Sequence, residues 1–173
     1  MRQYCTSCDI CQRVGKRGDR HKAKLCPLPI IEEPFSRVAV DIVGPLPKPS
    51  PSGKIYILTV VDYATRYPKA IALTNIHAET VAEALMKILS RVGFPQEIIS
   101  DRGTQFTAEV TQQLWKICGI KPIVNSAYHP QSNGLCERFN GTLKQMLRTF
   151  GEAHKDWERF LPHLLFAYRE VPQ

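Results

Sequence analysis

The sequence predicts an α/β fold in which a mixed five-stranded sheet is flanked by helices. Three strand-like runs come first, and their short connections predict an antiparallel meander. Two further short apolar runs then alternate with segments of helical periodicity, as expected when helices pack on a sheet. The expected order is therefore three strands, a helix, a strand, a helix, a strand and two final helices.

Each expected strand is a short run rich in β-branched or aromatic residues. We expect the three strands of the meander at residues 38–43, 55–61 and 69–73, with a proline-rich loop after the first. The fourth strand is expected at 97–100 and the fifth at 120–124. The first strand is apolar on both faces, which is typical of a central strand.

The first two helices are bounded by residues that commonly cap helices. Thr74 or Asn75 is expected to cap the first, and Gly93 to end it. Thr107 is expected to cap the second, which ends at Gly119.

The last two helices are expected at about 132–150 and 156–169. Pro162 lies inside the second pattern and predicts either a kink or a helix start there, because proline removes a backbone donor.

A proline-rich connector at residues 25–34 divides the chain into a basic, cysteine-containing segment (1–24) and a main domain (35–173). The basic excess is concentrated in the first segment, where seven basic and two acidic side chains give a net charge of +5. The whole chain carries +7. A basic arm favours a polyanionic partner, most often nucleic acid, although many basic tails are only solvated.

The overall composition narrows the class of protein. At 43% hydrophobic and 23% charged residues, the chain of 173 residues is expected to fold rather than be disordered. It contains no apolar run long enough for a membrane span and no secretory signal, so we expect an intracellular protein with reduced thiols.

Three acidic residues occupy positions where burying the carboxylate costs free energy or where the fold does not require an acid. Asp41 interrupts an apolar strand, and Asp101 follows the end of another. Neighbouring buried carboxylates repel each other unless a cation lies between them. The alternative is that each aspartate only ends a strand or caps a turn, as we expect for Asp62.

Glu137 lies on the helix expected at 132–150, on the side opposite to its apolar stripe, and shares its face with Asn140, Lys144 and Arg148. One interpretation is a solvated helix face with a charge pair. The other is that Glu137 binds a metal and that the neighbouring cations contact phosphates. The apolar stripe contains Leu135, Phe139, Leu143, Met146, Leu147 and Phe150.

The motifs around these acids are long and occur in a fixed order. They are Val40-Asp41-Ile42-Val43-Gly44-Pro45, Ser100-Asp101-Arg102-Gly103-Thr104-Gln105-Phe106 and Tyr128-His129-Pro130-Gln131-Ser132-Asn133-Gly134-Leu135-Cys136-Glu137. Between Asp101 and Glu137 lie 35 residues. In these features the chain resembles the integrases of retroviruses and long-terminal-repeat retrotransposons. The residues around each acid are similar to those of the gypsy-type branch of that family.

This resemblance implies a ribonuclease H-like fold and a polynucleotidyl transferase acting in DNA integration. Asp41, Asp101 and Glu137 would bind two Mg²⁺ or Mn²⁺ ions about 3.5–4 Å apart, one activating the attacking oxygen and the other stabilising the leaving oxygen. Gln131 and Asn133 resemble DNA-contacting positions, and Asn140, Lys144 and Arg148 would lie beside the DNA. The resemblance also implies a homo-oligomer in the full-length form.

The N-terminal cysteines have the spacing of zinc ligands. Cys8 and Cys11 resemble the Cys-x-x-Cys half of the family's zinc finger, whose two histidines would lie upstream of residue 1. We therefore expect no complete Zn²⁺ site, although Cys5 and His21 are possible substitutes. Cys26, Cys118 and Cys136 are expected to be apolar packing residues.

Two other functions compete with an active integrase. The first is a non-catalytic, host-retained integrase remnant that binds nucleic acid or a protein; the apparent loss of both flanking domains favours it, whereas the three acids do not. The second is a ribonuclease H-like nuclease, against which the 35-residue spacing counts. A nuclear location follows from the DNA substrate and the basic arm.

Overall fold

The computed structural model describes residues 33–124, 134–153 and 156–171. The chain divides into two units, residues 1–30 and 31–173, and all described residues belong to the second. None of the helices in the described ranges is long and apolar enough to cross a membrane.

Strands and helices alternate in the predicted order, except that the second helical segment consists of two helices. Each strand lies within one residue of its predicted limits, because β-branched apolar runs define strands clearly. The elements are β1 (Arg37–Val43), β2 (Tyr56–Asp62), β3 (Pro68–Leu73), α3 (Ala78–Val92), β4 (Glu97–Ser100), α4 (Thr104–Thr107), α5 (Glu109–Ile117), β5 (Lys121–Val124), α6 (Gly134–Ala153) and α7 (Trp157–Glu170).

The five strands form one mixed sheet in the order β3-β2-β1-β4-β5, which confirms the predicted fold class. The first three strands are an antiparallel meander. Strands β1, β4 and β5 are mutually parallel; β2, β3 and α3 lie between β1 and β4 in the chain, and α4 and α5 lie between β4 and β5. Strand β1 is therefore central, as its apolar sequence predicts.

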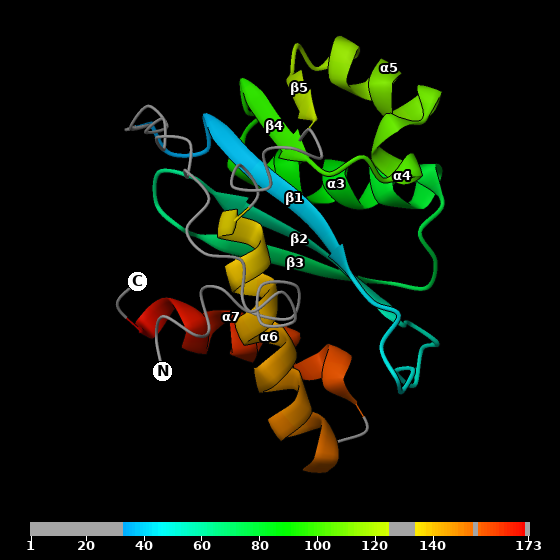
Figure 1. The fold of residues 1–173 in the computed structure, drawn as a ribbon, viewed down its shortest axis with the longest axis vertical. Coiled ribbons are helices and arrows are strands. Elements are labelled where there is room, and N and C mark those ends of the chain that lie inside the picture. Colours follow the sequence, from blue (N-terminus) through cyan, green and yellow to red (C-terminus); the bar gives the residue numbers. More distant parts are fainter. Residues whose placement is uncertain (1–32, 125–133, 154–155, 172–173) are drawn as a thin grey trace, which may run out of the picture. The chain divides into compact units, whose positions relative to one another are not determined.

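Helices cover both faces of this sheet (Figure 1). On one face, side chains of α6 and α7, such as Phe139 and Leu161, pack with Ala39 and Val43 of β1. On the other, α3, α4 and α5 pack against the alternate residues of β1, among them Val38. The period of two along a strand thus divides the core into two layers.

The N-terminal caps predicted for the first two helices are wrong, whereas Gly93 ends the first helix as predicted. The first described helix begins at Ala78, after His77, and Asn75 instead accepts a hydrogen bond from the His77 N–H (3.0 Å) in the preceding turn. Thr107 ends the four-residue helix α4, and its hydroxyl donates to the Gly103 carbonyl (3.3 Å). Both side chains satisfy local backbone groups, which short polar residues do readily outside helix N-termini.

The start of α7 is as predicted, because the Asp156 side chain accepts a hydrogen bond from the Arg159 N–H (3.4 Å). Pro162 lies inside this helix and does not begin it. Asp62 is completely buried at the end of β2 and accepts hydrogen bonds from Thr65 and the Phe35 N–H, which confirms its role as a turn residue.

The loop after β1 is attached to α7 through Glu158. This carboxylate accepts hydrogen bonds from Ser50 (3.0 Å), Ser52 and Lys54, and it pairs with the Lys54 ammonium. Burial alone would raise the pKa of Glu158, but these hydrogen bonds and the Lys54 charge outweigh it and lower the pKa below its ordinary value of 4.5.

We expect Glu158→Gln to lower the free energy of unfolding at neutral pH by about 1 kcal/mol, because the pair is partly exposed. Since the folded pKa lies below the unfolded one, this contribution is complete above about pH 4.5 and is lost as pH falls through the folded value. Urea unfolding of the variant, measured from pH 3 to 7, should therefore show a weaker acid dependence. Glu170→Gln, an exposed change on the same helix, is the control; an equal effect there would refute the assignment.

Candidate active site

Strand β1 directs the Asp41 side chain to the face of the sheet that α6 covers. Ala39 and Val43, two residues away on either side, pack in that layer. Asp41 is half-buried, and its Oδ2 accepts a hydrogen bond from the Asn140 Nδ2 on α6 (2.7 Å). Its Oδ1 accepts from the Ile42 N–H (2.8 Å). The carboxylate is thus fixed between the central strand and one helix.

Asp101 follows β4 directly and lies beside Asp41. The parallel register pairs Ala39 with Ile99, so the next same-face positions on the two strands are Asp41 and Asp101. Asp101 is exposed, and its Oδ1 accepts the Gly103 N–H (2.9 Å), which fixes the turn after the strand. The structure therefore brings together two of the three predicted acids at the carboxyl ends of neighbouring strands.

The pKa of Asp41 is raised above its ordinary value, and burial is the largest cause. The negative charge of Asp101 raises it further, whereas the hydrogen bonds from Ile42 and Asn140 and the Lys144 ammonium lower it. Two carboxylates that repel each other at a partly buried position form a site that a cation would stabilise.

Glu137 occupies the first turn of α6 and is exposed. Its neighbour Cys136 feels the negative charges of both Asp41 and Glu137, so the three side chains share one region. Across the described ranges, however, no three acidic, histidine or cysteine side chains lie close enough together to hold one metal ion. The third acid therefore lies in the region of the other two without closing a three-ligand cluster with them.

The predicted face of α6 is only partly as expected. Glu137, Lys144 and Arg148 are exposed along it, but Asn140 is only 4% exposed and donates to Asp41. A DNA contact through the Asn140 side chain does not fit this burial. Its Oδ1 is buried and has no hydrogen-bond partner in the described part of the chain. The side chain that donates to Asp41 therefore has one polar atom left unsatisfied within the described ranges.

The sequence reasoning missed Thr59, which is completely buried on β2 opposite Asp41. Its hydroxyl donates to the Asp41 carbonyl (3.1 Å) and shares a contact with the Cys136 thiol (3.5 Å). Cys136 is completely buried, as predicted for a packing residue, and burial raises its pKa to about 12. A single threonine inside an otherwise apolar strand is the sequence feature that could have identified Thr59 as a residue that supports Asp41.

Cys118 is half-buried and packs against the α3 layer, in keeping with its predicted role. Gln131, Asn133, Cys8 and Cys11 lie outside the described residues, and their predicted roles remain predictions.

We expect Asn140→Ala to raise the pKa of Asp41 further, because the variant removes a hydrogen bond that favours the ionised carboxylate. The direct measurement is a pH titration of the Asp41 carboxyl carbon by NMR. Gln145→Ala, an exposed change on the same helix, should leave that pKa as it is. A lower Asp41 pKa in the Asn140 variant would contradict the assigned hydrogen bond.

Comparison with known proteins supports one family. Residues 32–130, more than half of the chain, match the model of the integrase core domain. The chain is 35% identical over 147 residues to the retrovirus-related Pol polyprotein from transposon 412 of Drosophila melanogaster, an alignment that covers 82% of this chain and 12% of that protein. The curated relatives that head the comparison are much longer, and the chain spans only about a tenth of their length.

Two solved structures share the fold. A chain of the simian T-cell lymphotropic virus intasome, solved in complex with PP2A regulatory subunit B56 gamma, has a TM-score of 0.71 at 19% identity and is matched over 96% of this chain and 57% of that one. The catalytic core domain of BIV integrase has a TM-score of 0.61 at 24% identity, over 76% and 81% of the two chains. The sheet is thus of the ribonuclease H-like type found in retroviral integrase cores, as predicted.

The match of the family model, the Pol relative and the shared fold agree with the retroviral and retrotransposon resemblance, while the gypsy-type branch remains a prediction. This chain belongs to the integrase core domain family.

Proposed function

We propose that this chain forms the catalytic centre of a DNA integrase, a polynucleotidyl transferase that processes retroelement DNA ends and joins them to target DNA. The observation that carries the proposal is the proximity of two carboxylates on adjacent parallel strands, with Asp41 near the carboxyl end of β1 and Asp101 directly after β4. Helix α6, which contributes Asn140 to Asp41, also carries Glu137 in its first turn. Membership of the integrase core family supports the same reading.

The chemistry of these side chains fits a divalent metal. Carboxylate oxygens are the hard ligands that Mg²⁺ and Mn²⁺ prefer. The repulsion between Asp41 and Asp101, and the buried Asn140 Oδ1 that lacks a partner within the described residues, both favour a cation here. Asp41, Asp101 and Glu137 would hold the ions. When bound, the metal supplies Lewis-acid stabilisation of the oxygens in an in-line displacement at phosphorus.

The chain's own residues would prepare this centre by orienting both aspartates. Asn140 and the Ile42 N–H orient the Asp41 carboxylate and favour its ionised form. The Gly103 N–H orients the carboxylate of Asp101. No covalent protein–DNA intermediate is required, which agrees with Cys136 being a buried thiol with a pKa of about 12.

DNA would approach along the exposed face of α6. Lys144 lies about two turns after Glu137 and Arg148 about one turn further, and both are exposed, so they are suited to contact phosphates. Gln131 and Asn133 are proposed as further DNA contacts. Since one of the structural relatives is an intasome, we also propose that the full-length protein acts as a homo-oligomer. Because its proposed substrate is DNA, we further propose that it acts in the nucleus.

The test is a disintegration assay on labelled branched DNA with Mg²⁺ or Mn²⁺, comparing this chain with Asp101→Asn. Metal-dependent product that disappears in the variant, or when the metal is chelated, is the expected result. If the folded chain binds Mn²⁺ by calorimetry but yields no product, the proposal fails in favour of a non-catalytic remnant. Product of equal yield from Asp101→Asn would exclude Asp101 as a ligand.

A further inference from the structure

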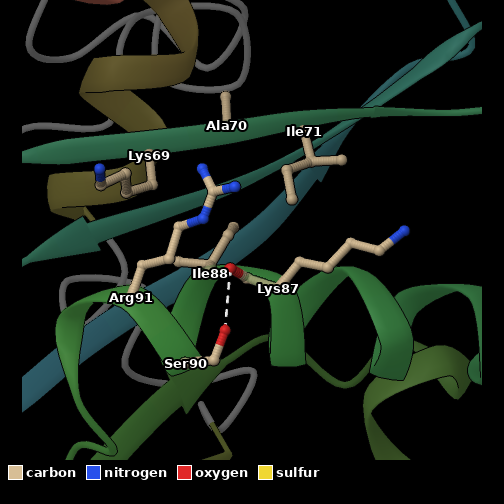
Figure 2. A pocket seen from close by; sticks show the side chains of 7 residues that line it. All are labelled: Lys69, Ala70, Ile71, Lys87, Ile88, Ser90 and Arg91. Carbon is tan, nitrogen blue, oxygen red and sulfur yellow. Dashed lines mark hydrogen bonds between the residues drawn. The ribbon is translucent and has the colours of Figure 1, made fainter.

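A basic pocket lies on the opposite face of the sheet from Asp41. Lys69 on β3 pairs with Val60 of β2, and Val60 packs in the α3 layer, so Lys69 points to that layer. Lys87 and Arg91 lie one turn apart on α3, are exposed and line the same pocket. Figure 2 shows the Arg91 side chain extending from α3 toward β3.

The charges of the three cations of this pocket are not compensated by ion pairs among the described residues. No carboxylate lines the cavity. Within the described part of the chain, no aspartate or glutamate lies within ion-pair distance of Lys69, Lys87 or Arg91. Lys69 instead lies 5.1 Å from the centroid of the Tyr67 ring. The pocket thus concentrates positive charge near the C-terminal end of α3. The helix dipole places only a partial negative charge there, which does not neutralise three cations.

The shape of the cavity also favours a small anionic group. Its volume is about 330 Å³, at the low end for ligand pockets. Its apolar wall is formed mainly by Ile71 and Ile88, which lower the local dielectric and strengthen the attraction of the cations for an anion. The Ser90 hydroxyl at the rim donates to the Lys87 carbonyl (3.4 Å), a bond drawn in Figure 2.

We infer that this pocket binds a phosphate group of a DNA backbone, at a site separate from the carboxylates. Arg91 would contribute the planar guanidinium that matches phosphate oxygens, and the two lysines would add charge around it. Because the sheet separates the pocket from Asp41, the bound phosphate would belong to a different stretch of DNA from the reacting one. The choice of DNA as the polyanion rests on the proposed function.

An acidic protein segment is the competing occupant, and the lining favours phosphate. Protein partners draw most of their binding energy from large apolar or aromatic anchors. None of the exposed large hydrophobic residues in the described ranges lines this pocket. Electrostatic attraction is therefore the main source of affinity, as in sequence-independent binding to a phosphate backbone.

The test measures how salt affects binding of a short fluorescein-labelled DNA duplex, by fluorescence anisotropy, in variants at the three cations. Each phosphate contact contributes about 0.9 to the slope of log K against log salt concentration. Arg91→Ala and Lys87→Ala should each lower the magnitude of that slope by about 1, and Arg91→Glu should weaken binding roughly tenfold at low salt. Lys116→Ala, an exposed basic residue on α5, is the matched control.

Two further measurements keep the outcome clear. In the NMR spectrum, backbone amides of Lys69 and Arg91 should shift on addition of the duplex, and also with sodium phosphate at higher concentration. Slopes equal to that of Lys116→Ala would overturn the proposal, as would binding of poly-glutamate that depends on Arg91 while DNA binding does not. Because binding is measured without turnover, a failed disintegration assay with altered slopes would reject the proposed catalysis and retain this site.

Discussion

Glu137→Gln is expected to slow metal-dependent strand transfer by about a thousandfold while leaving the free energy of unfolding unchanged. Glu137 is exposed in the first turn of α6, so it contributes little to the core. As a proposed metal ligand, its carboxylate would be essential. Metal stabilisation of the transition state contributes several kcal/mol, and about 4 kcal/mol corresponds to a thousandfold in rate.

The control for this effect is Glu109→Gln. Glu109 is also an exposed acid in the first turn of a helix, but α5 lies on the other face of the sheet. Disintegration and strand-transfer rates should be compared for both variants at saturating Mn²⁺, together with urea unfolding. Wild-type rates for Glu137→Gln would show that the third acid is not a ligand, and equal loss in Glu109→Gln would point to a general effect of surface charge on DNA binding.

The sheet was predictable because its sequence signals are local. Strands appear as β-branched runs, and the parallel pairing of β1 with β4 is consistent with the connection between them, which runs through the hairpin strands β2 and β3 and then helix α3. The carboxyl ends of parallel neighbours meet at one edge, so the approach of Asp101 to Asp41 could also be expected. The helix starts were less predictable, since Asn75 and Thr107 each had two possible backbone partners and only the tertiary structure decides between them.

Asn140 shows why the site was only partly predictable. Its polarity assigned it to the exposed face with Glu137, yet Cys136, Asn140, Leu143 and Leu147 recur at intervals of three and four residues and are all buried. An asparagine on a buried face requires hydrogen-bond partners, and in this fold Asp41 is one of them. The sequence contained the spacing, but the identity of the partner depends on how α6 crosses the sheet.

Phe139→Ala is expected to lower the free energy of unfolding by about 3–5 kcal/mol, as large-to-small changes of buried aromatic residues do. The Phe139 side chain is completely buried between α6 and the sheet and packs edge-to-face on Tyr168 of α7, with ring centroids 4.9 Å apart. Trp115→Ala is the matched change in the other layer, where Trp115 is 2% exposed on α5, and it should cost a similar amount. Urea unfolding of both variants gives the two values, with unchanged slopes as evidence of an intact fold.

The two variants should nevertheless differ at the active site. Phe139 lies on α6 between Glu137 and Asn140, so a cavity there loosens the helix that fixes the Asp41 carboxylate. We therefore expect Phe139→Ala to shift the Asp41 carboxyl titration and to slow strand transfer at temperatures where the protein remains folded, whereas Trp115→Ala leaves both unchanged. If the two variants affected the site equally, the sheet would have to transmit packing changes from one layer to the other. If neither did, the Asp41 carboxylate would be held by β1 alone, with the Ile42 N–H as its sufficient support.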